Sequence, residues 1–187
     1  MLFFPDDEDS SSLLEFNARI IFVDGGHFQV GTEAQPMTSR VDITLSGTKY
    51  DPAVPVFGKK VLAARNGLIS FVGQDVVDHT FLNASSVPWE SHISVAGDAG
   101  WHVGDHIVVG TTSFSNYESE ERTIVEISYD ETSETTSITL DTALWYHHFG
   151  DLFSAGKTGE EKDFEMRAEV ALLTRTIRFR GNPEDSQ

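Results

Sequence analysis

The sequence predicts an all-β protein, built as a right-handed parallel β-helix-like solenoid of short strands with at most one short helix. Short runs rich in Val, Ile and Phe alternate with Gly, Asn and Asp turn signals along nearly the whole chain. A 3.6-residue apolar repeat is almost absent, which argues against a helical domain. The predicted strands are short and irregularly spaced, with long loops at only some corners. This spacing favours a wound coil over a sandwich, although both are all-β folds.

The first half of the chain consists of predicted strands that are bounded by turn signals. Asp24-Gly25-Gly26 and Asn66-Gly67 are tight-turn sequences, and each predicts a hairpin or a corner between its flanking strands. Val41 to Leu45 alternates strictly, which indicates a half-buried strand with one face in solvent. The predicted strands of this half are residues 2–4, 18–23, 27–30, 41–45, 60–64 and 68–72.

The second half is organised around Gly100 to Val109, where a glycine-marked turn leads into an Ile-Val-Val run. Residues 164–173 are the one segment with a helical period and predict one to three helical turns. The predicted strands of this half are residues 92–95, 107–109, 122–128, 137–140 and 175–181. The length of 187 residues suits one domain, which we predict over residues 1–181, followed by a polar tail at 182–187.

The charge and the composition exclude several classes of function. The chain carries 30 acidic and 13 basic residues, for a formal net charge of −17. This charge repels nucleic acids and anionic lipid, and it opposes unassisted capture of an anionic polysaccharide. The absence of cysteine excludes disulfides and thiolate metal sites. No apolar stretch has the length of a membrane span, so we expect no membrane contact by this segment.

Four residues are candidates for catalysis. Asp98 and Asp105 lie around one turn and offer two carboxylates for glycoside cleavage, unless each only caps its own tight turn. Glu169 lies between apolar neighbours, where partial burial suits an acid catalyst. His148 follows a run of aromatic residues and offers an imidazole, unless it is a satisfied polar neighbour of the core.

The candidate ligand-binding residues are cationic or aromatic. Arg178 and Arg180 share a strand face and suit a clamp for the carboxylate of a uronic-acid sugar, unless they pair with local acids. The full set is Arg167, Arg175, Arg178 and Arg180 together with Trp101, Trp145 and Tyr146, unless the aromatic residues at 145 and 146 belong to the core.

Two further expectations concern modification and metal binding. Asn83-Ala84-Ser85 fits a glycosylation acceptor at Asn83. No metal site is predicted from ligand spacing. Ca²⁺ is the one candidate cofactor, because an acidic surface can recruit a cation that bridges to a sugar carboxylate.

A set of motifs in a fixed order resembles the eight-glycine domain family, from about Leu2 to Gly181. This family occurs in fibrocystin-type receptors and in cell-surface hyaluronan-binding and hyaluronan-degrading proteins. The chain departs from the family pattern around Trp89 and at His106. The motifs are Gly25-Gly26, Gly31-Thr32-Glu33 with Pro36, Ile43 to Gly47, Phe57 to Ala63, Trp101 to Val108, Leu144 with Tyr146 and His148, and Arg167 to Ile177.

The resemblance implies an extracellular location, as the ectodomain of a larger membrane or secreted protein with further domains in the same chain. It implies a carbohydrate- or protein-binding or scaffolding module, whose partner is a polysaccharide such as hyaluronan or an extracellular protein. The alternative that it implies is part of a hyaluronan-depolymerising glycoside hydrolase assisted by calcium.

Overall fold

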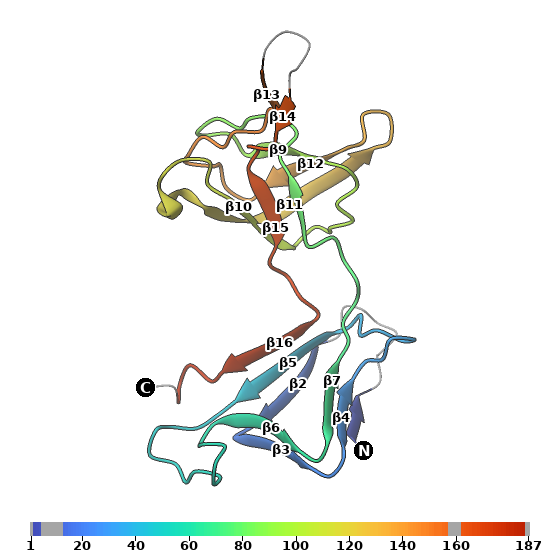
Figure 1. The fold of residues 1–187 in the computed structure, drawn as a ribbon, viewed down its shortest axis with the longest axis vertical. Coiled ribbons are helices and arrows are strands. Elements are labelled where there is room, and N and C mark those ends of the chain that lie inside the picture. The colour runs from blue at the N-terminus through green and yellow to red at the C-terminus, as the bar shows by residue number, and fades with distance from the viewer. Residues whose placement is uncertain (1, 5–12, 157–161, 186–187) are drawn as a thin grey trace. The chain divides into compact units, whose positions relative to one another are not determined.

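The computed structural model describes residues 2–4, 13–156 and 162–185, and these residues form an all-β protein. Their secondary structure consists of strands β1 to β16 and one short 3₁₀ turn, η1 (Asn116–Glu118) (Figure 1). The described chain divides into two compact units. Unit 1 comprises Met1–Asp75 and Arg175–Gln187, and unit 2 comprises Val76–Thr174. The predicted single domain over 1–181 and the tail at 182–187 stay predictions.

Unit 1 consists of three sheets in which every strand pair is parallel. Three consecutive strands pair one by one with the next three, β2 with β5, β3 with β6 and β4 with β7. In addition, β1 pairs with β4 and β16 pairs with β5. The strands are β1 (Leu2–Phe4), β2 (Leu13–Ala18), β3 (Ile20–Asp24), β4 (His27–Val30), β5 (Arg40–Leu45), β6 (Val61–Arg65), β7 (Leu68–Phe71) and β16 (Ile177–Gly181).

The two tight-turn sequences of unit 1 are corners and not hairpins, because the strands on either side of each lie in different sheets. The Gly25 N–H donates to the Arg65 carbonyl at 2.9 Å, and the Leu68 N–H donates to the Gly26 carbonyl at 2.8 Å. These bonds stack one corner on the other. A Cβ atom at Gly67 would lie 2.7 Å from the Gly26 oxygen, so only glycine permits this approach.

The core of unit 1 is built from alternating inward residues and a row of phenylalanines. Val41 and Ile43 of β5 are buried, but so are Asp42 and Thr44 on the opposite face. The prediction of a face in solvent is therefore wrong for this strand, because arginines of β5 and β16 contact Asp42 there. Ring centroids lie 5.9 Å apart for Phe16–Phe28, 5.5 Å for Phe28–Phe71 and 4.7 Å for Phe71–Phe179. The row therefore links β2, β4, β7 and β16, and each such pair adds about 0.5–1.5 kcal/mol beyond its buried area.

Unit 2 is organised around a six-stranded sheet of order β8-β15-β10-β11-β12-β9, and all of its pairings are antiparallel. The prediction of a solenoid through the whole chain is therefore wrong, because antiparallel neighbours reverse direction at each strand and cannot wind as a coil. The remaining pair, β13 with β14, is a separate antiparallel hairpin. The strands are β8 (His79–Phe81), β9 (His92–Ala96), β10 (His106–Val109), β11 (Glu120–Asp130), β12 (Thr135–Leu140), β13 (Phe153–Ala155), β14 (Lys162–Phe164) and β15 (Glu169–Leu172).

The helical turns predicted at residues 164–173 are also wrong. This segment contains the end of β14 and the whole of β15, a strand that pairs with β8 on one side and with β10 on the other. Val170 and Leu172 are buried in the core of the sheet. The two-residue alternation of these side chains decides the structure, because it places both of them on one face of a central strand.

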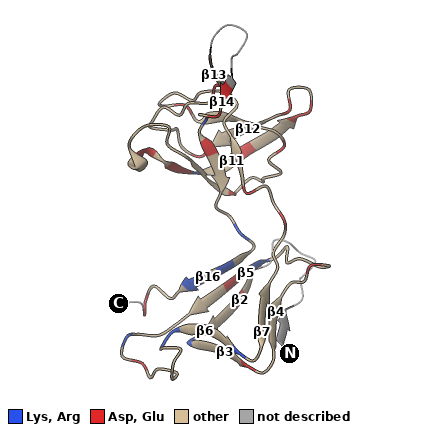
Figure 2. Ribbon diagram, in the orientation of Figure 1, with Lys and Arg blue, Asp and Glu red and all other residues tan. Residues whose placement is uncertain are grey.

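The two units differ strongly in charge. Unit 2 contains 18 Asp and Glu residues against four Lys and Arg, whereas unit 1 contains 12 against nine. Figure 2 shows blue on β16 beside a red segment of β5 in unit 1, and more red than blue segments along the tan ribbon of unit 2. A ligand that contacts unit 2 therefore meets a negative field. No described helix is long and apolar enough to cross a bilayer.

Candidate functional site

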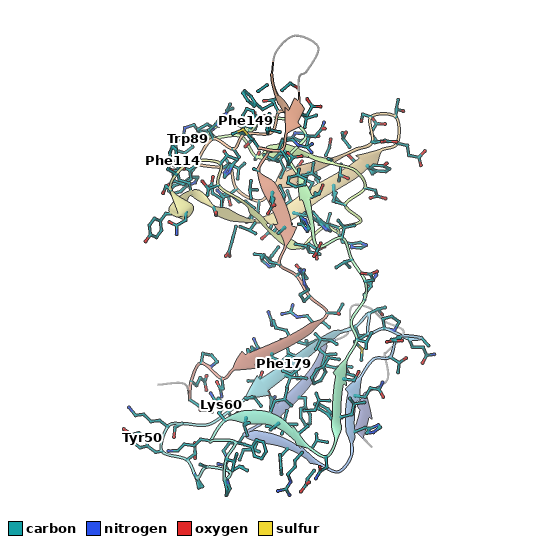
Figure 3. The ribbon with its side chains drawn as sticks, viewed as in Figure 1. Tyr50, Lys60, Trp89, Phe114, Phe149 and Phe179 are labelled. Atoms are coloured by element: carbon teal, nitrogen blue, oxygen red, sulfur yellow. The ribbon has the colours of Figure 1, made fainter. Side chains whose placement is uncertain are left out.

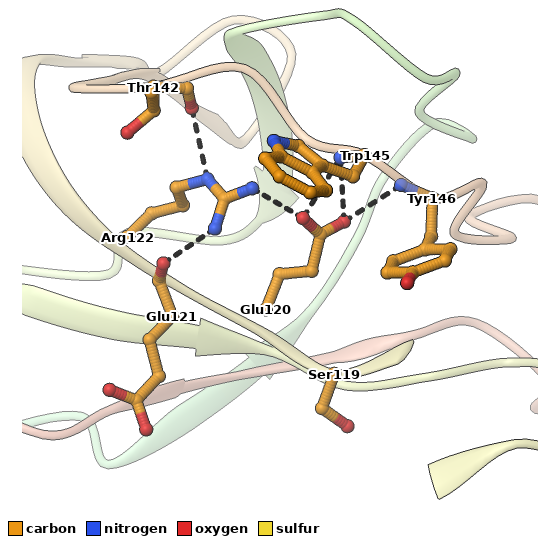
Figure 4. Close-up of a pocket in the computed structure, with 7 residues that line it drawn as sticks. All are labelled: Ser119, Glu120, Glu121, Arg122, Thr142, Trp145 and Tyr146. Carbon is orange, nitrogen blue, oxygen red and sulfur yellow. Dashed lines mark hydrogen bonds and ion pairs between the residues drawn. The ribbon is translucent and has the colours of Figure 1, made fainter. Parts of the chain in front are cut away.

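A buried carboxylate in unit 2 organises the candidate site. Glu120 starts β11, and its side chain is only 6% exposed. Both of its oxygens accept from the Trp145 N–H at 2.9 Å, and Oε1 also accepts from the Tyr146 N–H at 2.9 Å. Arg122 forms an ion pair with Oε2 (Figure 4), and the Nε2 atom of His148 lies 3.1 Å from Oε1. One side chain thus fixes the backbone of a loop that is more than twenty residues away in sequence.

Arg122 uses its whole guanidinium group inside the protein. Nε donates to the Thr142 carbonyl at 3.1 Å, Nη1 to the Glu121 carbonyl at 2.7 Å and Nη2 to the Ala143 carbonyl at 2.8 Å. These bonds and the Glu120 ion pair engage four of its five N–H groups, so this arginine supports the loop and neutralises Glu120.

The charge state of Glu120 follows from its contacts. Burial raises the pKa of this carboxyl group, but the N–H groups of Trp145 and Tyr146, the His148 ring and the Arg122 charge together hold the pKa below its usual value. Glu120 is therefore ionised at neutral pH.

His148 is fully buried and sits between two acceptors. Its Nδ1 atom lies 2.8 Å from the Gly110 carbonyl oxygen, and its Nε2 atom faces the Glu120 carboxylate. Each ring nitrogen therefore lies within hydrogen-bond distance of an oxygen, and these two contacts hold the His148 ring in one orientation beneath the loop.

A shallow pocket of about 370 Å³ lies over the Glu120 cluster. Trp145 is 64% exposed and Tyr146 is 39% exposed, while the N–H groups of both are held by Glu120. Two aromatic side chains are therefore presented to solvent from an anchored backbone. The pocket is lined by Ser119, Glu120, Glu121, Arg122, Thr142, Trp145 and Tyr146 (Figure 4).

The four catalytic candidates are not gathered at this pocket. Asp98 accepts from the Gly100 N–H at 3.0 Å, and Asp105 accepts from the His102 N–H at 2.8 Å, so each carboxylate caps its own turn. Glu169 is exposed on β15. Only His148 joins the cluster, where it is bonded beneath the pocket and is not among the residues that line it.

The remaining candidate residues of unit 2, Trp101, Arg167 and Asn83, do not line the pocket. Trp101 is buried in the core, and its indole N–H donates to the Val77 carbonyl at 2.7 Å. Arg167 pairs with Glu165 through Nε at 2.8 Å and Nη2 at 2.6 Å, and lies over the Phe81 ring. Asn83 is exposed just after β8, so the structure leaves glycosylation there sterically open, and it stays a prediction.

Three arginines of unit 1 gather around one buried acid that the sequence reasoning missed. Asp42 on β5 is 2% exposed, and Arg178 binds it through Nε at 2.9 Å and Nη2 at 2.6 Å. The Arg180 Nη2 atom lies 3.3 Å from the same carboxylate, and the Arg40 Nε atom lies 3.5 Å from it. The parallel register of β16 and β5 sets Arg178 beside Asp42. Arg175 is exposed just before β16.

Asp42 makes the stability of unit 1 dependent on pH. The Arg178 hydrogen bonds hold the pKa of Asp42 below its usual value, although burial opposes them. A lowered folded-state pKa stabilises the protein above the unfolded pKa of about 4, and this contribution is lost as the pH falls below it. Hydrogen exchange in increasing urea gives the urea midpoint of unit 1. We expect Asp42→Asn to lower this midpoint at pH 7 and to lower it much less at pH 3. An equal loss at both pH values would contradict this.

Sequence reasoning missed Glu120 and Arg122 because both belong to an ordinary-looking charged run, Glu118 to Arg122. The sequence signal that could have identified Glu120 is its position along the strand. Glu120 lies four residues before the buried Ile124 on the same strand face, where an apolar residue is expected. Among the described residues, no group of three or more His, Asp or Glu side chains is arranged to hold a metal ion.

Comparison with known proteins places the chain among larger relatives. Mouse fibrocystin-L is 37% identical over 166 residues, which cover 87% of this chain and 4% of that protein, and human fibrocystin-L is 36% identical over the same length. Protein rliB of Dictyostelium discoideum is 28% identical over 183 residues, or 95% of this chain and 15% of that protein. The chain thus spans about 4% of the length of the fibrocystin-L proteins it matches.

A comparison of folds gives a weaker match. The Gp54 tailspike of Acinetobacter baumannii bacteriophage AP22, solved with a capsular saccharide, aligns over 90% of this chain and 22% of its own. The identity is 14% and the TM-score is 0.36, so nothing about the fold or a ligand follows from this match.

The family resemblance is confirmed by an independent match in the N-terminal part of the chain. The sequence model of the G8 domain matches residues 1–83, which contain strands β1 to β8. Together with the fibrocystin-L identity over most of the chain, this match confirms the resemblance to the G8 domain family, whose model covers residues 1–83.

Proposed function

We propose that the chain is an extracellular carbohydrate-binding module of a larger protein, and that unit 2 carries its binding site. The observation that supports this most directly is the pocket in which Trp145 and Tyr146 are exposed while their N–H groups are held by the buried Glu120. Aromatic rings stack on the apolar faces of sugar rings, and an anchored backbone reduces the entropy lost on binding.

The charges around the pocket favour an uncharged sugar. Unit 2 carries a large excess of acidic residues, and its two arginines, Arg122 and Arg167, are both paired internally. Glu121 adds an exposed carboxylate at the pocket rim, which can accept hydrogen bonds from sugar hydroxyls but repels an anion.

The test is a binding measurement with the full chain and neutral oligosaccharides. Titration with chitohexaose and with cellohexaose is expected to give a saturable signal by calorimetry for at least one of them. Trp145→Ala is expected to weaken that binding at least tenfold, because it removes a stacking surface without removing the backbone N–H that Glu120 holds. Tyr50→Ala is the control, because Tyr50 is an even more exposed aromatic residue that lies in unit 1. Equal binding by the Trp145→Ala variant and the wild type would remove the proposal.

A second candidate function rests on the arginines around Asp42. Arg40, Arg178 and Arg180 share one buried carboxylate, and each is nearly half exposed, so the cluster carries positive charge on an otherwise acidic protein. Such a cluster suits the carboxylate of an acidic polysaccharide such as hyaluronan. Binding of hyaluronan oligosaccharides that weakens with salt and is lost in Arg40→Gln supports this candidate, while binding unaffected by Arg40→Gln excludes it.

Depolymerisation of hyaluronan has less support from the geometry, because Asp98 and Asp105 each accept a hydrogen bond within their own turn. Size analysis of fluorescent hyaluronan after incubation with the chain, with Ca²⁺ and with a chelator, tests it directly. Shortening of the polymer would establish the activity, and an unchanged size under all conditions would exclude it for this chain.

A further inference from the structure

Trp89 occupies a backbone position that suits glycine. The Glu90 N–H donates to the Val87 carbonyl at 3.3 Å, which closes a four-residue turn over Val87-Pro88-Trp89-Glu90. Proline at the second position and a φ of +74° at Trp89 in the third identify a type II turn. Glycine or asparagine is the usual residue at this third position, because a side chain there is crowded against the backbone. The fold therefore carries a local strain at Trp89.

The strained residue is also one of the most exposed aromatic residues of unit 2. The Trp89 side chain is 78% exposed, and Figure 3 shows it at the surface of this unit. Burial of the indole therefore does not compensate for the backbone strain. Strain held at an exposed position is typical of residues that contact a ligand.

Backbone hydrogen bonds bring Trp89 to the loop that carries Trp145. The Trp89 N–H donates to the Leu144 carbonyl at 2.7 Å, and the Leu144 N–H donates to the Glu90 carbonyl at 2.8 Å. Further along, Ser86 and His148 exchange hydrogen bonds in an antiparallel bridge. Trp89 is thereby hydrogen-bonded to the residue that immediately precedes Trp145, so the two tryptophans lie on neighbouring segments of unit 2.

We propose that Trp89 is a second sugar-stacking residue, which extends the Trp145–Tyr146 pocket across the neighbouring segment to receive an uncharged oligosaccharide. The inference rests on the proposed function and deepens it, because two tryptophans on paired segments contact successive sugar rings where one contacts a single ring. The ligand is uncharged for the reason given above, since unit 2 is acidic and its two arginines are paired.

The experiment separates the ring from the backbone conformation. Trp89→Asn removes the ring and tolerates a positive φ, whereas Trp89→Phe keeps a ring and the strain. With chitohexaose or cellohexaose as the probe, we expect Trp89→Asn to weaken binding at least tenfold and Trp89→Phe to stay within about threefold of the wild type. The melting temperature of unit 2 is expected to be unchanged or higher in Trp89→Asn, because the strain is relieved.

The outcomes distinguish this inference from the proposed function. If Trp145→Ala weakens binding and Trp89→Asn binds within twofold of the wild type, Trp89 is no ligand contact and only this inference fails. If Trp89→Phe loses as much affinity as Trp89→Asn, the ring is not what binds, and the inference fails again. If neither probe binds the wild type, the proposed function fails and this inference fails with it.

Discussion

Replacing Glu120 with alanine is expected to destabilise unit 2 by about 3–5 kcal/mol, the usual cost of removing one partner from a buried charge pair. The substitution leaves the Arg122 guanidinium and the His148 ring without their shared anion, and it frees the N–H groups of Trp145 and Tyr146. The two N–H groups then lack a partner, while Arg122 and His148 keep only their carbonyl acceptors and Arg122 loses the charge that balances it.

Tryptophan fluorescence measures this loss, because the three tryptophans of the chain, Trp89, Trp101 and Trp145, all belong to unit 2. We expect the urea midpoint of the fluorescence transition to fall sharply in Glu120→Ala. The matched control is Glu121→Ala, since Glu121 is the exposed neighbour on the same strand and is expected to change the midpoint little. Similar midpoints for the two variants would show that Glu120 does not organise the loop.

The second large effect is expected at Gly31 in unit 1. Gly31 has a φ of +69°, and a Cβ atom there would lie 2.2 Å from the Val72 carbonyl oxygen and 2.9 Å from the Met37 backbone nitrogen. These two atoms are hydrogen-bonded to each other at 2.9 Å, so neither can move without breaking a contact between successive turns. Gly31→Ala is expected to destabilise unit 1 by about 3 kcal/mol or more, from backbone strain and the displaced hydrogen bond together.

Gly25→Ala is the control that isolates the strain. Gly25 has nearly the same φ, +71°, but a Cβ atom there meets nothing within 4 Å. Its cost is expected to be only about 1 kcal/mol, the cost of a left-handed conformation alone. Hydrogen exchange of β4 and β5 measures unit 1 in both variants, and equal protection in the two would contradict the role of the close approach.

Part of the fold could be predicted from local patterns. Residues 27–30 and 41–45 lie in strands β4 and β5, because alternation and turn residues are encoded within a few positions. The same local reasoning failed at residues 164–173, where Phe164, Ala168 and Ala171 suggested a helical face. Strand β15 forms there because β8 and β10 are available on both of its sides, and partners so distant in sequence are invisible to a local pattern.

The candidate site shows the same division. The exposed aromatic residues Trp145 and Tyr146 were predicted as ligand contacts from their types alone. Glu120, which holds both of their N–H groups, was missed because it lies 25 residues before Trp145 in the chain. Arg178 and Arg180 were likewise expected to lie on one strand face, whereas Asp42, 136 residues before Arg178, was not expected as their shared partner.

The sequence by itself determined the all-β fold class of this protein, the places where its chain turns, its acidic charge and its family resemblance, because short motifs and composition carry this information. The tertiary structure alone decided which strands are parallel and which antiparallel, and which acid each arginine faces. Strand pairing and buried ion pairs join residues far apart in the chain, so their energies depend on packing that no single segment contains.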